Sequence, residues 1–160
     1  MKVILGADHA ATALKESLKG ALQKRGYEVA DVSPSVPQAG DDYPAYAFAV
    51  AEHVAAHPET RGILLCDTGV GMSIAANKVP GVYAALARDE RGARRAREHN
   101  GANILALGAE GAAADEAERA AVAFLTTPFS REERHARRVQ MIAGRERGVR
   151  GRPPEGTAER

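Results

Sequence analysis

The chain has 160 residues, of which 44% are hydrophobic and 27% charged, and this length and composition predict one globular domain. Twenty-two lysines and arginines against 21 aspartates and glutamates leave a formal net charge of +1, which excludes a global basic field for holding nucleic acid or an anionic membrane. The single cysteine excludes an internal disulfide framework and a cysteine-cluster zinc site.

Five short apolar runs are predicted to be strands: residues 3–5, 28–32, 63–66, 82–86 and 104–107. The segments between and after them have helical features: residues 11–22, 45–57, 89–100 and 113–125, and a last helix from residue 130. The first ends at Gly26, the third begins with an Asp89 N-cap, and the last opens with Ser130 and Glu133 as a capping box. Its predicted apolar stripe is formed by Val139, Ile142 and Ala143. Short apolar strands alternating with helices predict a doubly wound α/β fold, with a five-stranded parallel sheet covered on both faces.

Residues 1–147 are predicted to form a single domain. Residues 148–160 are rich in glycine, proline, arginine and glutamate, and are predicted to be a flexible tail because they have too little apolar surface to offset the entropy of ordering. The N-terminal apolar run is too short for a secretory signal, and no stretch is long and apolar enough for a membrane span, so we expect a cytoplasmic protein without a membrane partner.

Polar residues near the strand ends form the candidate site. Ligands of open parallel α/β sheets bind outside the carboxyl ends of the strands. Asp8 and His9 follow the first strand, residues 66–73 follow the third, and His99 and Asn100 come just before the fifth. The sequence therefore predicts that groups capable of acid/base chemistry gather at the strand ends.

The segment from Cys66 to Ser73 is predicted to be an anion cradle, because its two glycines leave backbone amides open to a ligand. It is not a dinucleotide fingerprint, since position 74 is isoleucine, and it lacks the glycine and hydroxyl residue of a Walker A loop around Lys78. A cysteine phosphatase would have arginine where Met72 stands. These three phosphate chemistries are excluded.

Each candidate side chain also has an ordinary structural interpretation. Cys66 ends an apolar run and could be a buried thiol, although oriented amides lower a thiol's pKa from about 8.5 toward neutrality and would make it a base. His9 and His99 could be surface or capping residues. Arg134 and Arg138 could lie on a solvated helix face, or could grip one phosphate together because they are one turn apart.

Several segments, in order along about 140 residues, resemble the type B ribose-5-phosphate isomerases and their galactose-6-phosphate isomerase relatives. The matching segments are residues 6–10 (Gly-Ala-Asp-His-Ala), 42–44 (Asp-Tyr-Pro), 62–78 around the glycine loop, 97–108 around His99-Asn100, and 133–139. The resemblance implies an aldose–ketose isomerase that works through a cis-enediol without metal or cofactor. It also implies a homodimer, possibly paired into a tetramer, whose active sites borrow residues from the partner.

The resemblance implies a role for each matched residue. Cys66 matches the base that moves a proton between C1 and C2, Thr68 the hydroxyl that assists exchange between O1 and O2, and His99 with Asp8 the pair that opens the furanose ring. The remaining matches are substrate contacts: Asn100, Asp67, Gly69, Val70, Gly71 and Ser73 around the sugar, His9, Arg134 and Arg138 at the phosphate, and Tyr43 in the pocket wall. The two arginines are expected to come from the neighbouring subunit.

The sequence departs from this family at Glu110, where relatives commonly have an arginine that contacts the phosphate. We expect Glu110 to turn outward or to pair with a C-terminal arginine. The substrate is expected to be ribose 5-phosphate, with a four- or six-carbon sugar phosphate as the alternative. Two other classes also fit the predicted fold, a phospho-acceptor receiver domain with Asp67 as its acceptor and a nucleotide-binding module. The first is disfavoured because no lysine follows the fifth strand, and the second because the phosphate fingerprint is missing.

Overall fold

The computed structural model describes residues 1–33, 40–146 and 148, so all of the expected C-terminal tail except residue 148 lies outside the described residues. Within these ranges, no helix combines the length and hydropathy that crossing a bilayer requires.

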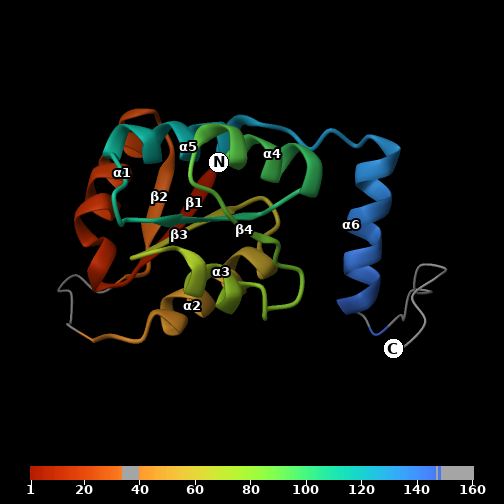
Figure 1. The fold of residues 1–160 in the computed structure, drawn as a ribbon, viewed down its shortest axis with the longest axis horizontal. Coiled ribbons are helices and arrows are strands. Elements are labelled where there is room, and N and C mark those ends of the chain that lie inside the picture. Colours follow the sequence, from red (N-terminus) through yellow and green to blue (C-terminus); the bar gives the residue numbers. More distant parts are fainter. Residues whose placement is uncertain (34–39, 147, 149–160) are drawn as a thin grey trace.

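The predicted α/β fold is confirmed. Five parallel strands form one sheet in the order β2-β1-β3-β5-β4, with helices on both faces (Figure 1). The strands are β1 (Lys2–Ala7), β2 (Glu28–Asp31), β3 (Arg61–Cys66), β4 (Ala84–Leu86) and β5 (Ile104–Gly108). The helices are α1 (Thr12–Lys24), α2 (Tyr43–Ala56), α3 (Val70–Ala76), α4 (Glu90–Asn100), α5 (Ala114–Thr126) and α6 (Glu133–Glu146), with a 3-10 turn at His9–Ala11.

The strand order bears on the receiver alternative. Flavodoxin-like sheets, the class to which receiver domains belong, have the order 2-1-3-4-5. Here β5 lies between β3 and β4, which contradicts the receiver alternative. The order reverses between β1 and β3, so their carboxyl ends form the crevice in which such sheets bind ligands.

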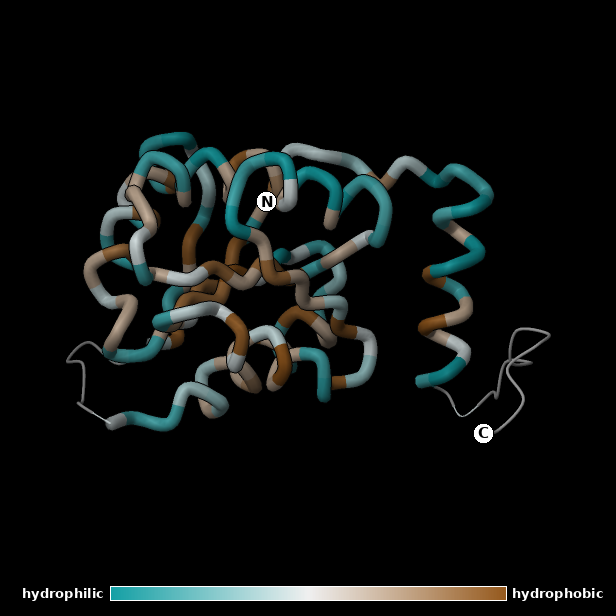
Figure 2. The backbone as a smooth tube through the Cα atoms, viewed as in Figure 1, coloured by the Kyte–Doolittle hydropathy of each residue, from teal (hydrophilic) through white to brown (hydrophobic). Residues whose placement is uncertain are grey.

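Alternation along the strands divides the core into two layers. Leu65 and the other side chains on one face of the sheet pack against α1, α4 and α5. Leu64 and Cys66 lie on the other face and pack against α2 and α3. Figure 2 shows the hydrophobic residues concentrated in the strands between these helix layers. Cys66 is therefore fixed at the rim of a packed core, where little rotational freedom remains.

The helix α6 differs from its prediction. Ser130 does not form a capping box with Glu133, because Arg131 turns the chain with a φ of 57° and the Ser130 hydroxyl accepts the Glu132 amide instead, at 3.4 Å. The predicted apolar stripe is only partly buried in this chain: Val139 and Ala143 are half-buried, whereas Ile142 is 50% exposed. Figure 1 shows α6 standing apart from the sheet and its two helix layers.

Candidate active site

Asp8 and Cys66 lie at the ends of the two strands that flank the crevice. The Asp8 amide donates to the carbonyl of Leu65, at 3.3 Å, so the two strand ends are hydrogen-bonded side by side. The Asp8 carboxylate accepts the Ala10 amide at 3.1 Å and is nearly buried, and this burial raises the pKa of Asp8. A carboxyl with a raised pKa is suited to exchanging protons with a substrate.

A left-handed glycine follows Cys66 and aims an amide at its sulfur. Gly69 has a φ of 76°, and its N–H donates to Cys66 Sγ at 3.2 Å. A β-carbon at Gly69 would lie 2.8 Å from the carbonyl carbon of Leu107, so both the backbone conformation and the lack of space require glycine. The turn therefore orients an amide donor toward the Cys66 sulfur at the crevice.

The rest of the loop brings a hydroxyl and a free amide beside the thiol. Thr68 is exposed, and its hydroxyl accepts the Val70 amide at 3.4 Å. Among the residues that the structure describes, nothing accepts a hydrogen bond from the Gly71 amide. The Tyr43 ring covers this glycine so closely that a β-carbon there would lie 2.6 Å from Cζ. The loop thus presents donors in a cleft that Tyr43 walls on one side.

A pocket of about 300 Å³ opens on the other side of the loop, between the ends of β3, β4 and β5. Asp67, Thr68 and Glu110 line it, together with Arg88, a residue that the sequence analysis missed. Glu110 is exposed and forms no ion pair with any described residue, so within the described part of the chain it does not pair with a C-terminal arginine. Arg88 likewise has no partner in the described part of the chain, so its charge is available to a ligand.

His9 is held by two residues that the sequence analysis also missed. Its Nδ1 lies 2.5 Å from Asp41 Oδ1, and the Tyr46 hydroxyl donates to the other oxygen of Asp41 at 2.8 Å. The hydrogen bond with Asp41 raises the pKa of His9. Burial alone would raise the pKa of Asp41, but the hydrogen bonds from His9 and Tyr46 outweigh it and lower that pKa. The sequence feature that could have pointed to Asp41 is the Asp-Asp-Tyr run at residues 41–43.

We expect Asp41→Asn to lower the pH midpoint at which His9 titrates. His9 is protonated below its pKa, and Asp41 extends this cationic form to higher pH; without the carboxylate, the midpoint falls toward the ordinary histidine value. Two-dimensional NMR of the imidazole nitrogens measures this midpoint directly. Tyr46→Phe is the matched control, because it keeps the carboxylate and leaves the midpoint at or above that of the wild type. An equal midpoint in Asp41→Asn and the wild type would show that Asp41 does not control His9.

His99 and Asn100 do not join this site within one chain, contrary to the expectation that all these groups gather together. They end α4, immediately before β5, and Asn103 pairs with Gly62 at the start of β3. His99 therefore lies at the amino edge of the sheet, whereas Cys66 lies at the carboxyl edge. At the usual rise of a parallel strand, the length of β3 between these edges is about 17 Å.

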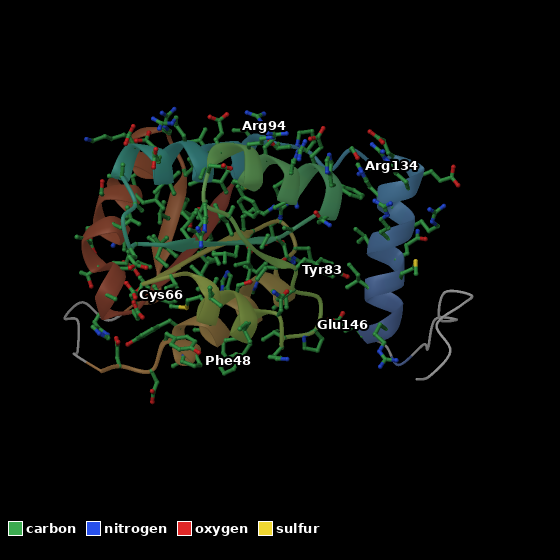
Figure 3. The ribbon with its side chains drawn as sticks, in the orientation of Figure 1. Phe48, Cys66, Tyr83, Arg94, Arg134 and Glu146 are labelled. Carbon is green, nitrogen blue, oxygen red and sulfur yellow. The ribbon has the colours of Figure 1, made fainter. Side chains whose placement is uncertain are left out.

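Arg134 and Arg138 are also remote from Cys66. Both are exposed on α6, and Figure 3 shows Arg134 at the other end of the molecule from Cys66. Arg134 pairs with Glu132 at 2.9 Å. Ser73, which was expected to contact substrate, donates its hydroxyl to the Ala84 carbonyl at 3.3 Å and ties α3 to β4. In the described ranges, no three histidine, cysteine or carboxylate side chains lie close enough to hold a metal ion.

Comparison with known proteins gives a consistent result. The family model described as Ribose/Galactose Isomerase matches residues 3–142. Ribose-5-phosphate isomerase B of Mycolicibacterium paratuberculosis is 40% identical over 156 residues, which cover 98% of each chain. The structure of ribose-5-phosphate isomerase B from Clostridium thermocellum has a TM-score of 0.87 and 43% identity, over 94% of this chain and 100% of that one. The Mycoplasma genitalium enzyme, solved with bound ribulose-5-phosphate, also has a TM-score of 0.87, with 37% identity over 91% and 96% of the two chains.

Proposed function

The chain belongs to the ribose/galactose isomerase family, and from that premise we propose that it is an isomerase that interconverts ribose 5-phosphate and ribulose 5-phosphate. The observation that carries the proposal is the Cys66 thiol at the β1/β3 crevice, which receives the Gly69 amide and has Asp8 on the neighbouring strand end. An aldose–ketose isomerase needs a base at this point, together with donors for the oxygen that gains charge.

Proton transfer at carbon is assigned to Cys66. Its thiolate removes the proton from C2 of the open-chain aldose, and the electrons of the C–H bond form the C1–C2 double bond of the enediolate while negative charge develops on O1. Thr68 moves a proton between O1 and O2, and the Cys66 thiol then delivers its proton to C1 to give the ketose. The Gly71 amide is available to the charged oxygen, and one such donor is worth roughly 3 to 4 kcal/mol in comparable sites.

Ring opening is assigned to Asp8 and to His99 of the partner subunit. One chain cannot bring its own His99 to Cys66, because the two lie at opposite edges of the sheet. In a twofold dimer, each chain can give its His99 and Asn100 to the other chain's Cys66 loop, so that two equivalent sites form.

An exposed apolar patch on α6 supports a homodimer. Met141 and Ile142 are 63% and 50% exposed, and with Val82 and Tyr83 they line an open groove between α6 and the chain before β4. Figure 2 shows the corresponding hydrophobic segment on the isolated helix. Exposed apolar side chains on a helix that stands off its own domain favour burial against a second copy.

The substrate phosphate is assigned to His9, with Arg134 and Arg138 of the partner subunit. His9 is 40% exposed at the crevice, and its bond to Asp41 favours the cationic form that a phosphate requires. The same α6 that offers its apolar face also carries both arginines, one helical turn apart. A tetramer and a cytoplasmic location remain predictions.

The proposed function is tested with a panel of aldose phosphates of four, five and six carbons. We expect ribose 5-phosphate to have the highest kcat/KM for ketose formation by the purified protein. A higher kcat/KM for a six-carbon or four-carbon substrate would overturn the pentose assignment, and no turnover of any of them would overturn the isomerase assignment.

We expect Glu110→Arg to lower KM for ribose 5-phosphate roughly three- to tenfold, with kcat within about twofold, because a phosphate contact is felt equally in the ground and transition states. Glu110 lines the pocket beside Asp67 and Thr68 and carries the same sign of charge as the phosphate. Steady-state kinetics measures both constants. Glu52→Arg on the exposed face of α2 is the matched control for the change in net charge and should leave KM unchanged. A raised KM in Glu110→Arg would instead indicate that Glu110 recognises the substrate or organises its neighbours.

A further inference from the structure

The helix α6 has a single buried residue, and it is a histidine. His135 is 4% exposed, whereas the apolar residues Met141 and Ile142 of the same helix are 63% and 50% exposed. A leucine or methionine would serve packing alone without the cost of burying polar nitrogens. The buried histidine ring therefore needs partners whose contacts offset the cost of burying its nitrogens.

His135 has two such partners. Its Nδ1 lies 2.8 Å from the Ser130 hydroxyl, and its ring packs against that of His99 with 4.3 Å between centroids and 31° between planes. Ser130 in turn donates its amide to the carbonyl of Glu98 at 3.0 Å. These contacts join the end of α4 to the start of α6, so His99 is held against the element that carries Arg134 and Arg138.

We propose that His135 is a positioning residue for the isomerase reaction, which together with Ser130 holds the His99 ring in the orientation needed for ring opening. The inference rests on the proposed function and adds two residues to it. His135 is buried behind His99 and acts through that ring rather than on the substrate.

The charge state of His135 agrees with this role. Burial lowers the pKa of His135, and His99 and Arg134 lower it further, while Glu132 opposes them and Arg138 adds a smaller lowering effect. His135 is thus neutral near pH 7. A neutral ring can lie against His99 whether or not His99 carries a proton, whereas a second positive charge would repel it.

The test compares kcat and KM for His135→Leu with those of the wild type, in each case with and without His99→Asn. We expect His135→Leu to lower kcat for ribose 5-phosphate about tenfold with KM within about twofold, because it disturbs a group that acts in the transition state. In the His99→Asn background it should have no further effect, since a residue that acts through His99 loses its role when His99 is absent. Gln140→Ala, on the exposed surface of α6, is the control and should match the wild type.

Two substitutions at Ser130 test the same proposal if His135→Leu does not fold. Ser130→Ala should lower kcat with unchanged KM, and Ser130→Thr, which restores the hydroxyl, should recover it. An unchanged kcat in His135→Leu or Ser130→Ala would overturn the positioning role. So would a double variant in which the kcat losses of His135→Leu and His99→Asn multiply. In either case, activity of the wild type would leave the proposed function intact. A wild type inactive on every sugar phosphate of the panel would overturn both.

Discussion

Cys66→Ala is expected to lower kcat for ribose 5-phosphate by about 10²- to 10⁴-fold, the range for loss of a proton-transfer group. Cys66 is the thiol of the β1/β3 crevice, and its sulfur accepts a hydrogen bond from the Gly69 amide at 3.2 Å. Asp8 and Thr68 stay in place in this variant, so the remaining turnover measures what binding and the loop amides achieve without the base. Steady-state kinetics on protein checked by circular dichroism gives the result.

The control separates lost chemistry from lost packing. Cys66 is 5% exposed, so alanine leaves a small cavity, and the lost sulfur should cost about 1 kcal/mol of unfolding free energy. Cys66→Ser keeps an acceptor for the Gly69 amide but replaces the thiol with a far weaker acid, and it should be nearly as inactive as the alanine variant. More than about a tenth of wild-type turnover in Cys66→Ala would show that another group is the base.

The fold was predictable because its signals are local. The apolar runs at β1, β3 and β5 are buried on both faces, and each of their predicted ends lies within two residues of the end in the structure. The helix α2 begins at Tyr43, two residues before its predicted start, because Pro44 fits the first turn of a helix. The predicted capping box does not form because Arg131, between Ser130 and Glu132, has a left-handed backbone conformation. The spacing of residue types in the sequence does not reveal this conformation.

The candidate site was predictable only where its residues follow a strand. Asp8, Cys66 and the glycine turn lie together because β1 and β3 are adjacent and parallel. Asp41 and Tyr46 were missed because their link to His9 depends on a tertiary contact across about thirty residues. Grouping His99 with strand-end residues was wrong for a simple geometric reason: it precedes β5, and a residue that precedes a parallel strand lies at the opposite edge of the sheet from one that follows it.

This placement of His99 leads to the prediction with the clearest outcome. A Cys66→Ala chain mixed with a His99→Asn chain should regain activity, although each homodimer has only a small fraction of wild-type turnover. In a mixed dimer that shares its sites, one site combines both substitutions, while the other combines an intact Cys66 with an intact His99 of the partner subunit. Random pairing of equal amounts then gives about a quarter of wild-type activity. Two different affinity tags allow the mixed dimer to be purified and its turnover measured.

The arrangement of the substitutions supplies the control. When Cys66→Ala and His99→Asn are placed on the same chain and that chain is paired with a wild-type one, both sites of the mixed dimer are damaged and the purified species should be inactive. The same comparison with Arg134→Ala/Arg138→Ala in place of His99→Asn should give the same pattern, because α4 and α6 are joined through Ser130 and His135 and reach the partner together. If the mixed dimer forms and only the same-chain arrangement is active, each chain completes its own site, and α4 and α6 would have to be placed differently from the way this fold places them.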